Sequence, residues 1–317
     1  MNPKLPLVPP RIVVLGSLNM DLVLRVPHAP VAGETLQGHS IHRMPGGKGG
    51  NQAVSCARQG ARVGLVGCVG ADDYGEALRQ GLLQDGIDIA AIRTDADAPT
   101  GTALVMVEDT GQNRIVVIAG ANARLEIDEA ALAAQLQGAA FLVAQFESPL
   151  PQVAHAMRIA RRTGCKVMLN PSPVQSIDDA LWPLIDTLVL NEREAEMLAG
   201  QPADSPYAAA TAGRALRVRG VERVVVTLGA RGAVAIDAAG ARHHPALRIQ
   251  AVDTTGAGDT FLGALAVSLA GGDALDDAVR LGIRAAALCI TQPGAQPSIP
   301  RRDAVLQSAL PPDWISL

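Results

Sequence analysis

The chain has 317 residues, with 27 Lys and Arg against 31 Asp and Glu, so its formal net charge is −4. This length allows one large domain or two ordinary ones with an ample core. Only two Trp, two Tyr and three Phe are present, which leaves no stacking platform for single-stranded nucleic acid, and the mild acidity argues against nucleic acid or an anionic membrane as a partner.

The apolar segments and the cysteines indicate where the chain resides. No apolar run approaches the roughly 18 residues of a membrane span. Prolines break the apolar stretch near the N-terminus and no small-residue cleavage site follows, so residues 11–16 predict a first strand rather than a signal peptide. Four cysteines lie in apolar contexts without C-x-x-C spacing, at Cys56, Cys68, Cys165 and Cys289. Such spacing is typical of buried thiols in a reducing compartment, so we expect a cytoplasmic protein.

Short β-branched runs alternate with Ala- and Leu-rich stretches of helical period. This pattern predicts an α/β fold, in which helices cover both faces of a mostly parallel central sheet. The expected strands are residues 11–16, 63–69, 140–146, 166–170, 187–191 and 223–228, with a further β-like stretch at 247–252. The expected helices are residues 51–59, 74–84, 152–162, 206–218, 258–269 and 274–291.

Two segments interrupt this alternation. Residues 21–44 carry Pro27, Pro30 and Gly33 among β-prone residues, and residues 101–119 have the pattern of a hairpin with the turn DTGQN. Neither segment contains the helix that a parallel crossover needs. We therefore expect a single domain, residues 1–317, with a small β-sheet lid inserted at about 19–45 and 100–120, which could act as a flap over a site.

The valines of this lid suggest an oligomer. Val105, Val107, Val116 and Ile118 fall at alternating positions, so we expect an unusually apolar outer face on the small sheet, which needs a cover. The main domain could supply it. A two-fold pairing of identical patches is the commonest solution among soluble oligomers, so we expect a homodimer joined through the lids.

The most informative motif is DTTGAGDTF, residues 253–261, which precedes an Ala- and Leu-rich helix. Its small residues allow backbone N–H groups to approach an anion, and the helix dipole favours negative charge at that end. Asp259 would lie in the first helical turn, where a carboxylate can accept a proton from an attacking hydroxyl. For GAGD alone, a glycine turn with Asp as a helix cap is the structural alternative.

Three polar segments accompany this motif. Asn19 and Asp21, in GSLNMD, follow the first strand and could bind hydroxyl groups or simply form a turn. GGKGGN contains Lys48 and Asn51 but is not a P-loop, because a glycine follows the lysine where that motif has Ser or Thr. Glu147, in QFESP, could bind a ligand or begin a helix.

Further candidates lie toward the C-terminus. Asn191 and Glu194, in NEREAE, could border hydrated Mg²⁺ and phosphates, with a helix capping box as the alternative. Thr227 follows a buried VVV run in TLGARG. The histidine pairs His39/His42 and His243/His244 have no Cys, Asp or Glu at metal-ligand spacing, which disfavours zinc.

Taken together and in this order, the motifs resemble the ribokinase family of carbohydrate kinases (the PfkB family), from residue 11 to about residue 302. The resemblance implies a ribokinase-like three-layer α/β/α fold with a small β-sheet lid. It also implies transfer of phosphate from ATP to the terminal hydroxyl of a pentose, D-ribose giving D-ribose 5-phosphate.

The resemblance also implies residue roles. Asp259 would be the catalytic base, and Gly256, Ala257 and Gly258 would form the anion hole for the γ-phosphate. The pentose would contact Asn19, Asp21, Gly47, Lys48, Asn51 and Glu147, with Gly50 standing where the family has Ala. The nucleotide phosphates and Mg²⁺ would contact Asn191, Glu194, Thr227, Gly229, Gly256 and Gly258. A monovalent cation, K⁺, would bind Asp253, Thr255, Cys289, Gln292, Gly294 and Ser298, of which only Asp253 and Ser298 would offer side chains.

Two alternatives stay open. One is a kinase for another small sugar or a nucleoside on the same fold, such as deoxyribose or a pseudouridine-type nucleoside. A nucleoside kinase would be expected to carry a stacking ring in the lid, and no Phe, Tyr or Trp lies between Leu18 and Met44. The other is a non-catalytic sugar or nucleotide sensor, which would have no need of Asp259 with its glycines.

Overall fold

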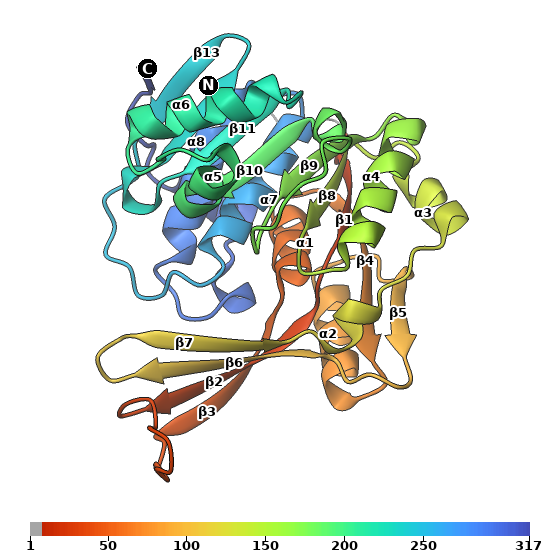
Figure 1. Cartoon of the computed structure of the whole chain (residues 1–317), viewed down its shortest axis with the longest axis vertical. Coiled ribbons are helices and arrows are strands. Elements are labelled where there is room, and N and C mark those ends of the chain that lie inside the picture. Colours follow the sequence, from red (N-terminus) through yellow and green to blue (C-terminus); the bar gives the residue numbers. More distant parts are fainter. Residues whose placement is uncertain (1–7) are drawn as a thin grey trace.

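Ten strands form one large sheet in the computed structural model, which describes residues 8–317 (Figure 1). Residues 1–7 lie outside the described residues. Part of the stretch considered above as a signal peptide falls on them. The sheet order is β14-β13-β12-β11-β10-β9-β8-β1-β4-β5. The parallel strands are β5 (Ile92–Asp95), β4 (Arg62–Gly70), β1 (Arg11–Leu15), β8 (Phe141–Gln145), β9 (Lys166–Asn170), β10 (Thr187–Asn191) and β11 (Arg223–Thr227).

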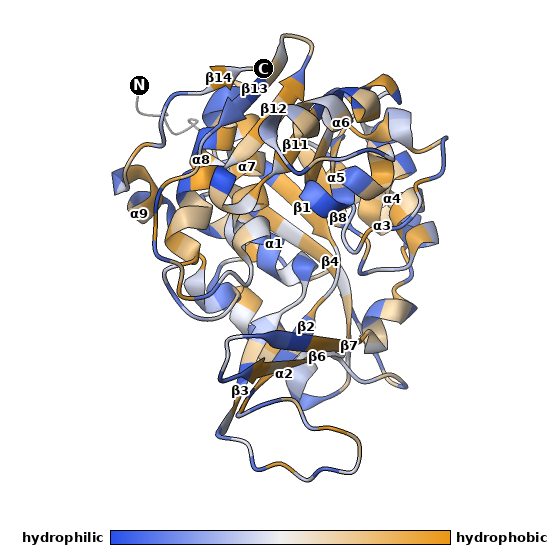
Figure 2. Ribbon diagram, turned by 60° about the vertical axis from the view of Figure 1, so that its left-hand side comes forward, coloured by the Kyte–Doolittle hydropathy of each residue, from blue (hydrophilic) through white to orange (hydrophobic). Residues whose placement is uncertain are grey.

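The last three strands run antiparallel to their neighbours and extend one edge of the sheet. They are β12 (Ala233–Asp237), β13 (Gly240–His244) and β14 (Ile315–Ser316). In the parallel part, runs such as FLVAQ in β8 are buried along their whole length, because helices cover both faces. Figure 2 shows this hydrophobic character on β1 and β4 in the middle of the molecule.

Two hydrophobic cores lie on opposite faces of the sheet. The first is formed with α3 (Glu129–Leu136), α4 (Leu150–Thr163), α5 (Glu192–Ala199) and α6 (Pro206–Val218). The second is formed with α1 (Lys48–Arg58), α2 (Asp73–Gln84), α7 (Ala257–Ala270) and α8 (Leu275–Cys289). A short helix, α9 (Arg302–Gln307), follows α8. The predicted α/β class with three layers is confirmed. Among residues 8–317, no helix is long and apolar enough to cross a membrane.

A second sheet of four strands projects from the main body (Figure 1). Its order is β3-β2-β6-β7, with β2 (Asn19–Val26) and β6 (Gly101–Glu108) parallel at its centre, and β3 (Ser40–Gly46) and β7 (Asn113–Ile118) at its edges. Both segments that interrupt the α/β alternation in the sequence therefore supply this small sheet.

The expectation that the small sheet has one apolar face, formed by Val105, Val107, Val116 and Ile118, is wrong. The register pairs Val105 with Ile115 and Leu104 with Val116, so Val105 and Val107 lie on the opposite face from Val116 and Ile118, since successive side chains of a strand alternate. Apolar surface is instead concentrated on the edge strand β7, where residues 115–118 are each 55 to 59% exposed.

Two further expectations need correction. Residues 247–252 form no strand, because their side chains line a cavity beside α7 and α8 and the segment pairs with no neighbouring strand. Helix α1 begins at Lys48, three residues before the expected start at Asn51, so two glycines of GGKGGN are helical.

Candidate active site

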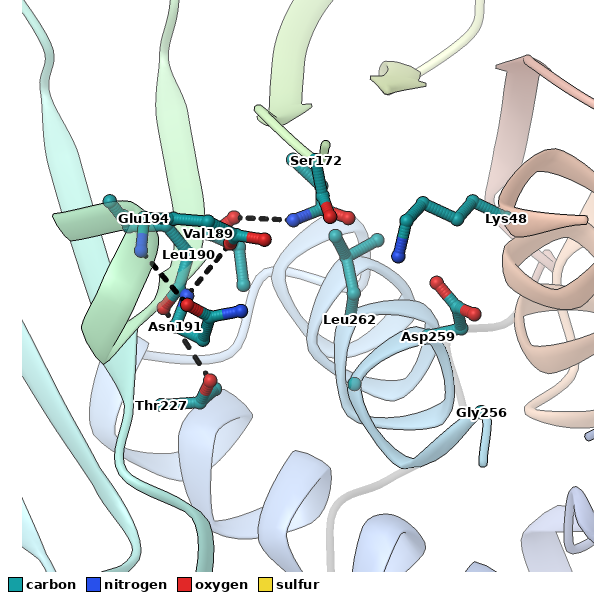
Figure 3. A pocket seen from close by; sticks show the side chains of 12 residues that line it. Lys48, Ser172, Val189, Leu190, Asn191, Glu194, Thr227, Gly256, Asp259 and Leu262 are labelled. Carbon is teal, nitrogen blue, oxygen red and sulfur yellow. Dashed lines mark hydrogen bonds between the residues drawn. The ribbon is translucent and has the colours of Figure 1, made fainter. Parts of the chain in front are cut away.

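The carboxyl ends of the parallel strands meet the N-termini of α1 and α7 at one crevice, where open α/β sheets bind ligands. β9 ends at Asn170, β10 at Asn191 and β11 at Thr227. These residues border a central cavity of 150 Å³ (Figure 3). Its other lining residues include Lys48, Ser172, Glu194, Gly256, Gly258, Asp259 and Leu262.

Asp259 lies in the first turn of α7 and is only 7% exposed. Both oxygens of its carboxylate accept hydrogen bonds from buried amides of α1. Oδ2 accepts from Nδ2 of Asn51 at 3.0 Å, and Oδ1 accepts from Nε2 of Gln52 at 2.9 Å. The carboxylate is thus held in one orientation at the edge of the central cavity, with Lys48 facing it (Figure 3).

The start of α7 has the features of an anion site. Gly256 is its N-cap, with a left-handed φ of 76° that a side chain would strain. Gly256 and Gly258 both border the central cavity, and the N–H groups of a first helical turn have no intrahelical acceptors. The N–H of Ala257 donates to the carbonyl of Thr254 at 3.2 Å, so in this conformation it is engaged within the loop.

Lys48 is surrounded by acidic groups. Burial alone would lower the pKa of its ammonium group, but the charges of Asp259, Glu147 and Glu194 outweigh burial and raise that pKa. Lys48 therefore stays a cation, and it lies between the central cavity and a second, larger one that it also lines.

The second cavity has a volume of 560 Å³ and lies between the main body and the small sheet. Among the predicted pentose contacts, Asn19, Lys48 and Glu147 line it. Oε2 of Glu147 accepts hydrogen bonds from Oγ of Ser17 at 2.5 Å and from the N–H of Lys48 at 3.0 Å. Gly47, the N-cap of α1, has a φ of 83° and packs so closely that a Cβ would lie 2.8 Å from the nitrogen of Asn19.

Asp21 reaches this region from β2. Burial, followed by the charges of Glu147 and Asp259, raises its pKa from 3.8 to about 7. Its Oδ1 is buried without a hydrogen-bond partner in the described part of the chain. A carboxyl group in this state suits a ligand that can both donate and accept a hydrogen bond, as a hydroxyl group does.

On the far side of the central cavity, Asn191 and Glu194 form the capping box of α5. Oδ1 of Asn191 accepts from the N–H of Glu194, and Oε2 of Glu194 accepts from the N–H of Asn191, both at 2.9 Å. Asn191 and Glu194 therefore form the helix capping box that was the alternative for the NEREAE segment. Both residues also border the central cavity.

A third cavity of 300 Å³ adjoins the central one, and Thr227 and Gly258 border both. Gly229 lies at its rim, and the segment that the sequence predicted as a strand, residues 247–252, contributes Leu247, Ile249 and Ala251 to its wall. Its lining is mostly aliphatic and includes Phe261, Ile283 and Ile290. Such a cavity suits a flat apolar group next to a charged one in the central cavity.

The predicted cation-binding residues form one connected group. The carboxylate of Asp253 accepts hydrogen bonds from the N–H and hydroxyl of Thr255 and, at 2.8 Å, from the N–H of Gly294. Burial alone would raise the pKa of Asp253, but these hydrogen bonds outweigh it and lower that pKa. Sγ of Cys289 lies 3.0 Å from Oγ of Ser298, and the carbonyl of Cys289 accepts from the N–H of Gln292. Within residues 8–317 no cluster of three or more His, Cys, Asp or Glu could hold a metal ion.

Several residues at the site were not predicted. Asn122 donates to Oδ1 of Asn19 at 2.8 Å and also fixes the backbone of Leu18. Gln52 and Gln145 form a buried amide chain behind Asp259. The available signal was a polar pair, Asn51 and Gln52, within a helix made mostly of small residues, since buried polar residues need partners.

Comparisons with known proteins identify a family and several relatives. The family model described as "pfkB family carbohydrate kinase" matches residues 9–302. The chain is 40% identical over 297 residues to the ribokinase of Haemophilus influenzae, covering 93% of this chain and 97% of that protein. It is 33% identical over 291 residues to the deoxyribokinase of Salmonella typhi, covering 91% and 95%. The structure of Arabidopsis thaliana ribokinase complexed with ribose and ATP matches with a TM-score of 0.89 at 30% identity, covering 95% of this chain and 100% of that one.

Proposed function

The chain belongs to the pfkB family of carbohydrate kinases, and we propose that it phosphorylates D-ribose at O5 with ATP, giving D-ribose 5-phosphate and ADP. One observation carries this assignment. The carboxylate of Asp259, at the N-terminus of α7, is held by two amides of α1 and borders the central cavity, which adjoins a cavity large enough for a pentose and an apolar cavity suited to a nucleotide base.

In the proposed reaction, ribose lies in the 560 Å³ cavity against Asn19, Lys48 and Glu147, with Asp21 near Glu147 as a further contact. Its O5 hydroxyl gives its proton to Asp259 while O5 bonds to the γ-phosphorus. The bond from that phosphorus to the bridging oxygen breaks, and ADP leaves. Phosphoryl transfer requires mainly positioning and charge stabilisation.

The groups at the start of α7 would stabilise the transferring phosphoryl group. We assign the N–H groups of Gly256 and Gly258 to its oxygens, with Ala257 joining if its N–H turns away from Thr254. Lys48 adds a positive charge beside Asp259 (Figure 3). Thr227, at the junction of the central and apolar cavities, and Gly229, in the wall of the apolar cavity, would contact the phosphates.

The residues present fit Mg²⁺ held mainly by water and phosphate. Asn191 and Glu194 border the central cavity, and their capping box engages one carboxylate oxygen of Glu194. Magnesium retains most of its waters and needs few protein ligands. Bound there, it would neutralise phosphate charge, and Glu194 would orient its water shell.

We also propose that K⁺ binds at the loop formed by Asp253, Thr255, Cys289, Gln292, Gly294 and Ser298. Asp253 has a lowered pKa and is therefore anionic at neutral pH. The loop reaches the anion site directly, since a Cβ on Gly256 would lie 3.1 Å from Cα of Ala295. A cation there would offset the charge of Asp253 and favour the negative phosphoryl group.

Two proposals concern the whole molecule. The exposed apolar edge of β7 supports a homodimer joined through the small sheets, since long apolar edge strands favour pairing with another chain. The buried, unpaired cysteines support residence in the cytoplasm.

Deoxyribose is the second candidate substrate, because the deoxyribokinase of Salmonella typhi is 33% identical to this chain. The two sugars differ only in the hydroxyl at C2. A coupled assay of ADP formation with ribose, deoxyribose, fructose and uridine ranks them by kcat/KM, and mass spectrometry identifies the product. We expect ribose to rank first and to yield ribose 5-phosphate. A higher kcat/KM for deoxyribose would assign the second function, and ADP formation independent of any sugar would overturn both.

A further inference from the structure

We infer that Gln52 is a positioning residue for Asp259, and that Gln145 holds Gln52 in the orientation this role needs. The inference rests on the proposed function, in which Asp259 is the base. Gln52 and Gln145 both have fully buried side chains, and neither borders the three cavities of the site. They therefore act on the reaction through the residues that they hold, of which Asp259 is the proposed base and Asn170 lines the central cavity.

The frame around Gln52 is tightly packed. Helix α1 lies against α7, where Oγ of Ser55 donates to the carbonyl of Thr260 at 3.0 Å. A Cβ on Gly263 of α7 would lie 2.2 Å from that same hydroxyl, so any other residue there would push the helices apart. Gln52, one turn before Ser55 on α1, thus meets Asp259 across a fixed helix pair.

The hydrogen bonds define which end of the Gln52 amide faces Asp259. Asn170 donates from Nδ2 to the carbonyl of Val189 at 3.0 Å, so its Oδ1 is an acceptor, and it lies 3.2 Å from Nε2 of Gln52. Nε2 of Gln145 donates to Oε1 of Gln52 at 2.6 Å. A flipped Gln52 would set two donors against each other at Gln145 and two acceptors against each other at Asp259.

Gln145 packs against Gly16, the residue after β1. A Cβ on Gly16 would lie 2.0 Å from Oε1 of Gln145, so the glycine makes room for this side chain behind the site. Gln145 therefore donates to Gln52, and Gln52 donates to Asp259. The backbone carbonyl of Val189 fixes the amide of Asn170, and Asn170 in turn fixes which end of the Gln52 amide donates.

This arrangement matters for the proposed proton transfer. A carboxylate has about four lone-pair positions on its two oxygens, and Asn51 and Gln52 occupy one on each. Two donors from one helix hold the plane of the carboxylate, so the remaining lone pairs keep a fixed direction. A displacement of about 1 Å at a reacting group can reduce the rate by about 10²-fold.

The test compares Gln52→Met with Gln59→Met. Gln59 provides a matched control, because it is also on or beside α1, is fully buried, and donates to a backbone carbonyl, that of Pro300, at 2.9 Å. We expect Gln52→Met to lower kcat by about 10-fold or more, with the KM values for ribose and ATP nearly unchanged. Both variants should stay folded, with the larger loss of Tm in Gln52→Met, because it leaves three buried partners unpaired where Gln59→Met leaves one.

Gln145→Leu provides a second, independent variant, since it touches Asp259 only through Gln52. It should also lower kcat, and the double variant with Gln52→Met should be no slower than Gln52→Met alone. A kcat within twofold of wild type in Gln52→Met, or additive losses in the double variant, would overturn the inference. Absent ribose phosphorylation by wild type would instead contradict the proposed function, and the positioning role with it.

Discussion

Oδ2 of Asp253 accepts a hydrogen bond from the N–H of Gly294 at 2.8 Å, joining two segments 41 positions apart in the sequence. Asp253 opens the motif that leads to the anion site, and Gly294 belongs to the loop after α8. The φ of Gly294 is 85°, so glycine allows the turn that brings this N–H to the carboxylate. The hydrogen bond thereby links the loop after α8 to the segment that leads into α7, so a cation bound at this loop would lie close to the start of α7.

We predict that K⁺ raises the rate of ribose phosphorylation above that in choline at matched ionic strength, because a cation relieves the negative charge of Asp253 beside the anion site. Asp253→Asn should lose most of this activation while keeping its fold, as measured by Tm. Equal wild-type rates in the two salts would count against the cation site.

The carboxyl group of Asp21 predicts a pH dependence of stability. Its pKa is about 7 in the folded chain against an ordinary value of 3.8, so the folded state holds a proton that the unfolded state has lost between these values. The protonated carboxyl group of Asp21 therefore contributes fully to the free energy of unfolding below pH 3.8, and this contribution is lost as the pH rises through about 7.

Asp21→Asn removes this dependence. Its Tm should exceed that of wild type at pH values above about 7 and match it near pH 4, as measured by thermal denaturation without ligand. Asp73→Asn, at an exposed position of α2, provides the control. A constant Tm difference between Asp21→Asn and wild type across this pH range would show that the carboxyl group does not titrate as described.

The exposed edge of β7 predicts a dimer at micromolar concentration. Ile115 and Val117 share one face of the strand and Val116 and Ile118 the other, so a charge on the edge should disrupt pairing whichever face is used. Ile115→Lys together with Val116→Lys should give a monomer in sedimentation. Met197→Lys, at an exposed apolar position of α5, should not. A wild-type monomer with full activity would refute the dimer and leave the kinase function intact.

Local sequence patterns could predict much of this architecture. Runs such as TLVLN and FLVAQ are continuous apolar strands, because they are buried on both faces of a parallel sheet. The DTTGAGDTF motif predicts the turn and helix start around Asp259 because both depend on neighbouring residues. Helix α6 was predicted with both ends correct, since Ser205 caps it and Pro206 begins it.

Features that depend on distant contacts could not be predicted. Gln52 meets Asp259 across 207 positions and Asn170 across 118, and nothing near it in the sequence indicates these partners. The faces of β6 and β7 depend on a register that alternation alone leaves open, which is why Val105 and Val116 were placed together wrongly. Residues 247–252 have strand-like composition but pack on a cavity instead of a neighbouring strand.

The central claim is that Asp259 is the base of a ribose kinase, and the turnover of Asp259→Asn tests it most directly. Asparagine nearly preserves the shape of the side chain but cannot accept the proton. The account predicts a kcat for ribose phosphorylation lower by about 10² to 10⁴-fold, while calorimetry still detects binding of ribose and ATP. A kcat within a few-fold of wild type, with ribose 5-phosphate as the product, would contradict it.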